Sequence, residues 1–301
     1  MKFLKVTAAV GAAGLLGLAC FLWGTAPVRT PDDLWQGLGE PNIANGERVF
    51  SEGGCSSCHA APGAGDDGRL VLAGGAPLAS PFGTFHAPNI SPHPEAGIGG
   101  WSLHEFGDAM LRGVGRQGEH LYPSFPYASY ARMTPSDIND LFGYLKTLPA
   151  SANVAPAHEL PFPFDQRALL GGWKFLYLND DPRVAIANAD AKVERGQYLV
   201  EGPGHCGECH TPRDALGGLK ADLWLAGGPN PEGGPGRVPN ITPGGLDGWS
   251  ESDIAYYLES GFTPDYDSVG GSMTAVQKNM ARLPAEDRDA IAAYLKAIPA
   301  H

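Results

Sequence analysis

The chain has 301 residues, 43% of them hydrophobic, which is typical of a globular protein of about two domains. Its 42 glycines and 27 prolines favour short helices and loops over a coiled coil or a large regular sheet. With 21 basic and 33 acidic residues, the net charge of −12 would repel a phosphate backbone. The composition therefore argues against nucleic acid as a partner and favours basic or neutral ones.

The first predicted element is an apolar helix. Lys2 and Lys5 precede a run without charges from Val6 to Val28, and Arg29 ends it. A helix of that length would cross the ~30 Å hydrocarbon layer, and the run is longer than a cleaved signal peptide needs. We therefore predict that residues 1–29 form an uncleaved transmembrane anchor. The alternative is a signal peptide that is cleaved. The flanking charges place the anchor in the inner membrane and the rest of the chain in the periplasm.

The remaining sequence contains one unit twice. Cys55 and Cys206 are 151 residues apart, and so are Asn89–Pro92 and Asn240–Pro243, which read NISP and NITP. Tyr-Leu-Lys at 144–146 recurs at 294–296. Self-similarity at a fixed spacing indicates two copies of one fold. The domains we predict are 40–149 and 194–301.

Each copy is predicted to consist of short helices joined by Gly/Pro-rich loops. Asn45 is in position to cap a helix that leads towards Cys55. Ser102–Glu105 and Ser250–Asp253 have the spacing of a capping box at the start of a middle helix. The last helix begins at Pro135 in the first copy, where a missing backbone donor costs nothing. No segment alternates like a strand for long enough to build a sheet, so both copies are predicted to be all-α.

Residues 150–193 connect the two copies. The segment contains prolines, but it also carries many large apolar residues: Phe162, Phe164, Leu169, Leu170, Trp173, Phe175, Leu176 and Tyr177. A flexible linker would not expose that much apolar surface. We therefore expect a packed connector that holds the copies in a fixed geometry.

Four of the five cysteines belong to two C-x-x-C-H motifs. The first consists of Cys55, Cys58 and His59, and the second of Cys206, Cys209 and His210. The spacing places two thiols one helical turn apart, so that both can add to the vinyl groups of one porphyrin, and the histidine then ligates the iron. The motifs predict two covalently attached c-type haems, against the alternative of two unrelated redox or zinc sites.

A sixth iron ligand decides whether each haem transfers electrons or reacts with small molecules. In the second copy the candidates are Met273, in a glycine-rich loop before the final helix, and Met280, which also suits the core. Met273 is the predicted ligand, because its loop has the freedom to approach the haem face.

In the first copy, Met133 occupies the equivalent place before the last helix and is the predicted ligand. His120 and His86 are alternatives that would give a bis-histidine site of lower potential. Met110 falls on a helical face with Leu103, Phe106 and Val114 and is interpreted as a core residue.

The motifs and their surroundings resemble the cytochrome c subunit family of bacterial membrane-bound alcohol and aldehyde dehydrogenases. The resembling segments are 88–92 (PNISP), 97–102 (GIGGWS), 121–127 (LYPSFPY), 162–164 (FPF) with Arg167, and 204–213 (GHCGECHTPR). They span about residues 40–300. The resemblance implies two tandem class I cytochrome c domains after the transmembrane helix.

The chain departs from this family in two respects. Well-known members carry three haems, whereas this chain has two C-x-x-C-H motifs and therefore resembles a shorter, diheme branch. Many relatives have a methionine, their natural iron ligand, where this chain has Phe125. Phenylalanine does not bind iron, and for that reason Met133 is considered instead.

The resemblance implies a periplasmic electron carrier. Such a protein takes electrons from a dehydrogenase and passes them to quinone, or to another cytochrome and a terminal oxidase. The main alternative is a diheme peroxidase or thiosulfate-oxidising enzyme with an open or exchangeable ligand on one haem. A cysteine-ligated haem is disfavoured because Cys20, the fifth cysteine, falls within the predicted anchor. A purely structural or sensory haem protein is the third alternative.

Overall fold

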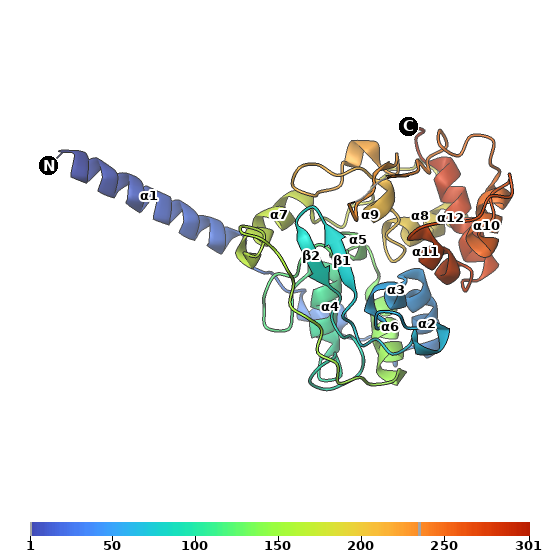
Figure 1. Ribbon diagram of the computed structural model, residues 1–301, viewed down its shortest axis with the longest axis horizontal. Helices are drawn as coiled ribbons and strands as arrows, with labels where there is room; N and C mark the ends of the chain where they lie inside the picture. The colour runs from blue at the N-terminus through green and yellow to red at the C-terminus, as the bar shows by residue number, and fades with distance from the viewer. Residues whose placement is uncertain (1, 234–235) are drawn as a thin grey trace.

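The computed structural model describes residues 2–233 and 236–301 and is mostly helical, as predicted (Figure 1). The helices are α1 (Lys2–Gly24), α2 (Ile43–Glu52), α3 (Cys55–His59), α4 (Leu103–Arg112), α5 (Tyr127–Tyr130), α6 (Pro135–Thr147), α7 (Leu170–Tyr177), α8 (Ala191–Glu201), α9 (Gly207–His210), α10 (Glu251–Ser260), α11 (Met273–Met280) and α12 (Ala285–Ala297). Short 3-10 helices lie at η1 (Asp32–Trp35), η2 (Asp66–Gly68), η3 (Arg167–Leu169) and η4 (Ala221–Leu223).

Two small antiparallel sheets correct the strictly all-α prediction. Strand β1 (Pro77–Ser80) pairs with β2 (Gly83–His86), and β3 (Gly228–Pro229) pairs with β4 (Arg237–Val238). The first hairpin turns over two residues, where the Ser80 hydroxyl donates to the Gly83 carbonyl at 2.8 Å. Gly83 has a φ of +120°, which favours glycine. Strands of two to four residues are too short for an alternating pattern to reveal them in the sequence.

Two separate hydrophobic cores form, one in each half of the chain. The first core cluster comprises Val49, Phe50, Leu72, Ile98, Phe106, Met110, Leu111, Tyr130, Met133, Ile138, Leu141, Tyr144, Leu145 and Leu148. The second core cluster comprises Leu199, Val200, Trp224, Leu225, Leu246, Ile254, Leu258, Met280, Leu283, Ala290, Ile291, Ala292, Tyr294, Leu295 and Ile298. The two clusters fall within residues 40–149 and 194–301 respectively, and the tandem domain arrangement stays a prediction.

The same helix crossing organises each core. Helix α2 packs against α6, and α8 packs against α12. At the crossings, a Cβ atom on Gly46 would overlap the Asp140 carbonyl, and one on Gly196 would overlap the Ala290 carbonyl. A glycine at each crossing therefore lets the first and last helices of each half approach closely.

Capping residues determine where several helices begin. Ser102 and Ser250 each form a complete capping box, and the Thr134 hydroxyl accepts from the Asp137 backbone N–H. The capping boxes at Ser102 and Ser250 and the start of α6 at Pro135 confirm the predictions. The cap of α2 is Asn42 rather than Asn45, because the Asn42 side chain accepts from the backbone N–H of Asn45, which lies inside the helix.

The connector contacts both halves through α7. Lys174 Nζ donates to the Gly113 carbonyl at 2.7 Å, at the end of α4. Trp173 Nε1 donates to the Leu216 carbonyl at 3.1 Å, in the loop after α9. One short helix thus joins the two halves by hydrogen bonds.

Helix α1 projects from the body of the molecule in Figure 1. Residue 1 lies outside the described residues. Within the described part of the chain, no helix is long and apolar enough to cross a membrane. The predicted inner-membrane anchor over residues 1–29, and the periplasmic placement that depended on it, are therefore not supported.

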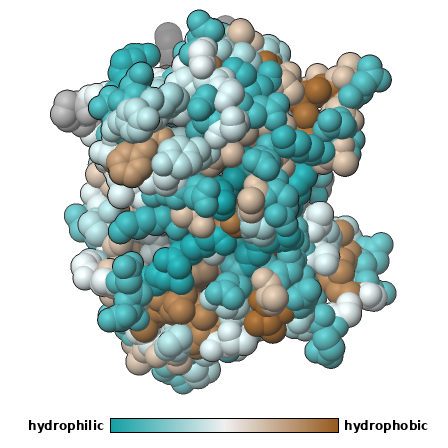
Figure 2. Space-filling view, turned by 90° about the vertical axis from the view of Figure 1, so that its right-hand side faces the viewer, coloured by the Kyte–Doolittle hydropathy of each residue, from teal (hydrophilic) through white to brown (hydrophobic). Residues whose placement is uncertain are grey.

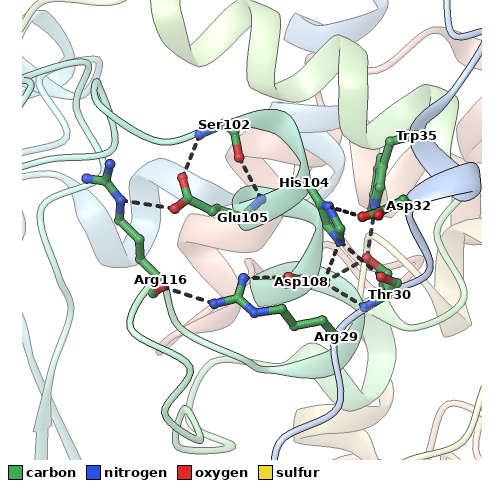
Figure 3. Close-up of polar contacts among 9 residues, drawn as sticks. All are labelled: Arg29, Thr30, Asp32, Trp35, Ser102, His104, Glu105, Asp108 and Arg116. Carbon is green, nitrogen blue, oxygen red and sulfur yellow. Dashed lines mark hydrogen bonds and ion pairs between the residues drawn. The ribbon is translucent and has the colours of Figure 1, made fainter.

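The segment after α1 is bound to α4 by a polar network around Asp108 (Figure 3). The fully buried Asp108 carboxylate accepts from the Thr30 backbone N–H and hydroxyl, both at 2.7 Å, and from Arg29 at 2.9 Å. Trp35 Nε1 donates to the Thr30 hydroxyl, and His104 Nε2 donates to the Thr30 carbonyl. Arg29, expected at a membrane boundary, instead forms an ion pair with the body of the protein.

We predict that Asp108→Ala lowers the free energy of unfolding by about 1–3 kcal/mol, because the Thr30 donors lose their acceptor while remaining buried. Guanidinium unfolding of the holoprotein followed by far-UV circular dichroism measures the change. Asp32→Ala is the control, since the Asp32 side chain is 86% exposed and should matter by less than about 0.5 kcal/mol. Equal effects of the two variants would contradict the role given to Asp108.

Candidate haem sites

The two C-x-x-C-H motifs form one-turn helices that directly follow left-handed residues. Gly54, with φ +57°, separates α2 from the first motif in α3. His205, with φ +39°, holds the matching position before Cys206 and α9. A left-handed residue turns the chain out of the preceding helix, so that each motif begins a new one. His205 adopts this conformation although it is not a glycine, which is uncommon.

None of the cysteines is paired in a disulfide, so both thiols of each motif are available for attachment. Burial raises the pKa of Cys55 and of Cys206 to about 12. Burial also raises the pKa of Cys209 to about 11, with smaller contributions from Glu208 and from Cys58 of the first motif. Each motif presents two thiols one turn apart, which is the spacing of c-type haem attachment.

A backbone carbonyl orients each motif histidine. His59 Nδ1 lies 2.8 Å from the Pro88 carbonyl, and His210 Nδ1 lies 2.8 Å from the Pro239 carbonyl. A carbonyl only accepts, so Nδ1 carries the proton in both rings and Nε2 has a free lone pair for a metal. Burial lowers the pKa of both histidines, which favours the neutral ligating form.

The two carbonyl acceptors, Pro88 and Pro239, were not assigned a role from the sequence. Pro88 and Pro239 each lie 29 residues after the histidine that they contact. The following asparagines, Asn89 and Asn240, each accept from a backbone N–H two residues further on, at 2.8 Å in both copies. The recurrence of Pro-Asn-Ile at one distance from each motif was the signal that could have identified this support.

Both motifs line one continuous cavity of about 2610 Å³. Small-molecule pockets usually measure about 300–1,000 Å³, so this cavity suits more than one large group. Its walls are largely apolar and include Trp101 and Trp249, the matched tryptophans of the two copies. Thiols, histidine Nε2 atoms and apolar walls together fit two covalently held haems.

The second copy offers two methionines to this cavity. Met273 is half-buried and begins α11 rather than lying in a loop as predicted, and it lines the cavity. Met280 is buried at the other end of the same helix and also lines the cavity. Met273 and His210 thus border the same space, and the choice of Met273 stays a prediction.

The first copy presents different side chains. Met110, Phe125 and His86 line the cavity, whereas Met133 and His120 are not among the lining residues in the described part of the chain. Met133 is buried in the first core cluster. His120 Nε2 donates to the Thr25 carbonyl at 3.0 Å, so that nitrogen already has a partner. The ligand role of Met133 stays a prediction that its position does not favour.

Cys20 requires a correction. The sequence interpretation placed it inside a membrane, but it is exposed near the end of α1 and is among the residues that border the cavity. The argument against cysteine ligation that relied on the membrane is therefore removed.

The two attachment turns are in direct contact with each other. His205 Nε2 lies 3.2 Å from the Gly53 carbonyl, and the His205 ring meets the Tyr130 ring edge-on at 5.7 Å. Ser129 donates to Glu208 at 2.8 Å, between the first half and the second motif. These contacts place the two haem sites side by side.

A buried ion cluster joins the halves beside these turns. Arg195 on α8 donates to Glu52 on α2 at 2.6 Å and to Asp287 on α12 at 2.7 Å. Burial raises the pKa of Glu52 to about 7, with Arg195 acting in the opposite direction and Asp287 adding to the rise. The second carboxylate oxygen of Glu52 is buried without a hydrogen-bond partner, which agrees with an incompletely compensated charge.

The raised pKa of Glu52 predicts a pH dependence of stability. The folded chain holds this proton up to about pH 7, whereas the unfolded chain releases it near 4.5. Folding therefore gains most from Glu52 below pH 4.5 and loses that contribution as the pH rises through 7. We predict that wild type becomes less stable relative to Glu52→Gln by on the order of 2–3 kcal/mol between pH 4.5 and 8.

Guanidinium titrations of both proteins across this range measure the difference. Glu47→Gln is the matched control, because Glu47 is exposed on the same helix. A wild-type stability that stays parallel to that of Glu52→Gln would contradict the raised pKa.

The turns, the carbonyl-held histidines and the shared cavity are those of a c-type cytochrome with two haem sites. Residues 43–149 match the cytochrome c family profile. A diheme cytochrome c-type protein of Cereibacter sphaeroides is 54% identical over 287 residues, covering 95% of each chain. The chain therefore belongs to the cytochrome c family and binds two covalent c-type haems.

Two further relatives are subunits of larger enzymes. The fructose dehydrogenase cytochrome subunit of Gluconobacter japonicus is 37% identical over 266 residues, which are 86% of this chain and 53% of that subunit. The cytochrome c subunit of an alcohol dehydrogenase (quinone) of Gluconobacter oxydans is 34% identical over 300 residues, 96% of this chain and 60% of that subunit. The chain thus spans little more than half the length of these relatives, and an electron-transfer role is common to the family.

Proposed function

We propose that this chain carries electrons from a dehydrogenase to a quinone, a second cytochrome or a terminal oxidase. The observation that carries the proposal is the single cavity lined by both attachment motifs. An enzyme with two separate tasks would gain nothing from placing both haem sites in one space, whereas a carrier gains a short path. The cytochrome subunits of dehydrogenases among the relatives support the choice of donor.

When bound, each haem supplies an iron that changes by one electron between its ferric and ferrous states. The protein residues hold this group in place: the motif cysteines attach it, and His59 and His210 present Nε2 because the carbonyls of Pro88 and Pro239 hold Nδ1. The apolar cavity walls keep water away and so favour the less charged state. Electron transfer needs no further movement of these groups.

The contacts between the two halves keep the sites at a fixed separation. The His205 contact to Gly53 joins the attachment turns, and the cluster of Glu52, Arg195 and Asp287 braces the helices that lead into them. A fixed separation suits repeated electron transfer, because each transfer then meets the same geometry.

One face of the molecule suits a polar partner. Figure 2 shows the side of the molecule that carries α10 and α2 in Figure 1, where hydrophilic residues dominate and hydrophobic ones form separate groups. With a net charge of −12, the chain would be guided towards a basic docking surface. We propose that the dehydrogenase and the acceptor present such surfaces.

For the second haem we propose that Met273 would serve as an iron ligand together with His210, because both side chains line the same cavity. Met273→Leu is predicted to remove the second haem's share of the near-infrared methionine-to-iron band and to lower its reduction potential, because a thioether stabilises ferrous iron. Absorption spectroscopy and a potentiometric titration measure both effects. Met280→Leu is the control and should keep the band. Loss of the band in Met280→Leu but not in Met273→Leu would identify Met280 as the ligand instead.

The proposed function is tested with a sugar or alcohol dehydrogenase from which the cytochrome subunit has been removed. With its substrate present, this enzyme should reduce both haems of the holoprotein within its own turnover time, as followed in the visible α band. Rapid consumption of hydrogen peroxide or thiosulfate, without acceptance of electrons from the dehydrogenase, would instead identify a diheme enzyme.

A further inference from the structure

The two copies can be aligned residue by residue around the middle helix. Helices α4 and α10 have ten residues each, start at the capping boxes of Ser102 and Ser250, and end at left-handed glycines, Gly113 and Gly261. The loop that follows closes with the same bridge in both copies, Val114 to His120 and Phe262 to Ser268. All these pairs are 148 residues apart.

The hydrogen bond that follows this loop also recurs at residues 148 positions further on in the second copy. Leu121 N–H donates to the Gly113 carbonyl and Val269 N–H donates to the Gly261 carbonyl, both at 2.7 Å. Four residues later in each copy, the register pairs Phe125 with Met273. Both side chains line the cavity. The first copy therefore has a phenyl ring, which has no lone pair for iron, where the second copy has a thioether.

Beyond this point the second copy contains two additional residues. Met133 N–H donates to the Tyr130 carbonyl at 2.8 Å, and Leu283 N–H donates to the Met280 carbonyl at 3.1 Å, which pairs Met133 with Leu283. Met133 and Leu283 are buried in the two core clusters, and neither lines the cavity within the described part of the chain. Met133 thus corresponds to a core leucine.

The register of the middle helix pairs Met110 on α4 with Leu258 on α10. Both are buried, and both line the cavity. At two matched cavity positions, each copy therefore has one methionine and one hydrocarbon side chain, but at opposite positions. The second copy has Met273 and Leu258, and the first copy has Phe125 and Met110.

We propose that Met110 is the sixth ligand of the first haem. A thioether is a soft ligand that suits haem iron, and the unbranched side chain has three rotatable bonds with which to reach it. Packing alone does not require methionine here, because leucine fills the matching place in the second copy. This proposal rests on the electron-transfer function proposed above, because an iron with two protein ligands is suited to transfer electrons.

The test reads the near-infrared band in holoprotein variants. In Met273→Leu, the remaining band belongs to the first haem. Adding Met110→Leu should abolish it and allow ferrous carbon monoxide binding at the first haem, whereas adding Met133→Leu, a matched swap at a core position, should leave it unchanged. Adding Phe125→Met to the double variant should restore the band, because position 125 would then match position 273.

Three results would overturn the proposal. The band could persist after Met110→Leu, it could disappear with Met133→Leu, or it could already be absent in Met273→Leu with carbon monoxide binding to the first haem of wild type. The last result would indicate an open iron and favour an enzyme. Reduction of each variant by the dehydrogenase is measured separately, so that a failure of the ligand assignment is distinguished from a failure of the proposed function.

Discussion

The contact between the two haem-attachment turns is the constraint on which the rest of the structure depends. His205 of the second turn reaches the Gly53 carbonyl of the first, and both turns open into one apolar cavity. A fixed contact of this kind requires rigid halves, which the glycine crossings at Gly46 and Gly196 provide. It also requires a rigid joint, which the Arg195 ion cluster and the connector helix α7 supply.

Much of this could be predicted from the sequence because it rests on local spacing or on the repeat. The C-x-x-C-H motifs, the capping boxes at Ser102 and Ser250, and the two-fold duplication all follow from residues within a few positions of each other or at a constant offset. The short hairpins, the Asp108 network and the cap at Asn42 could not be predicted. They depend on which distant backbone groups meet, and apolar periodicity does not encode that.

At the first haem site, the place of a methionine in the sequence did not indicate where its side chain lies. Met133 precedes the last helix much as Met273 does, yet hydrogen bonds pair Met133 with Leu283 and place both in the cores. Met133 lies two residues before α6, whereas Met273 itself begins α11, and the register aligns Met273 with Phe125 instead. Duplicated modules therefore keep their scaffold while the position that supplies a methionine diverges.

The central claim, two haems held side by side in one cavity, is tested most directly by circular dichroism in the Soret region. The holoprotein should show a two-signed band from coupling of the two porphyrins, and a variant with Cys206→Ser and Cys209→Ser, which carries one haem, should show a single-signed one. The matching variant with Cys55→Ser and Cys58→Ser carries only the second haem. A holoprotein spectrum equal to the sum of the spectra of these two variants would mean that the haems are far apart and do not share one cavity.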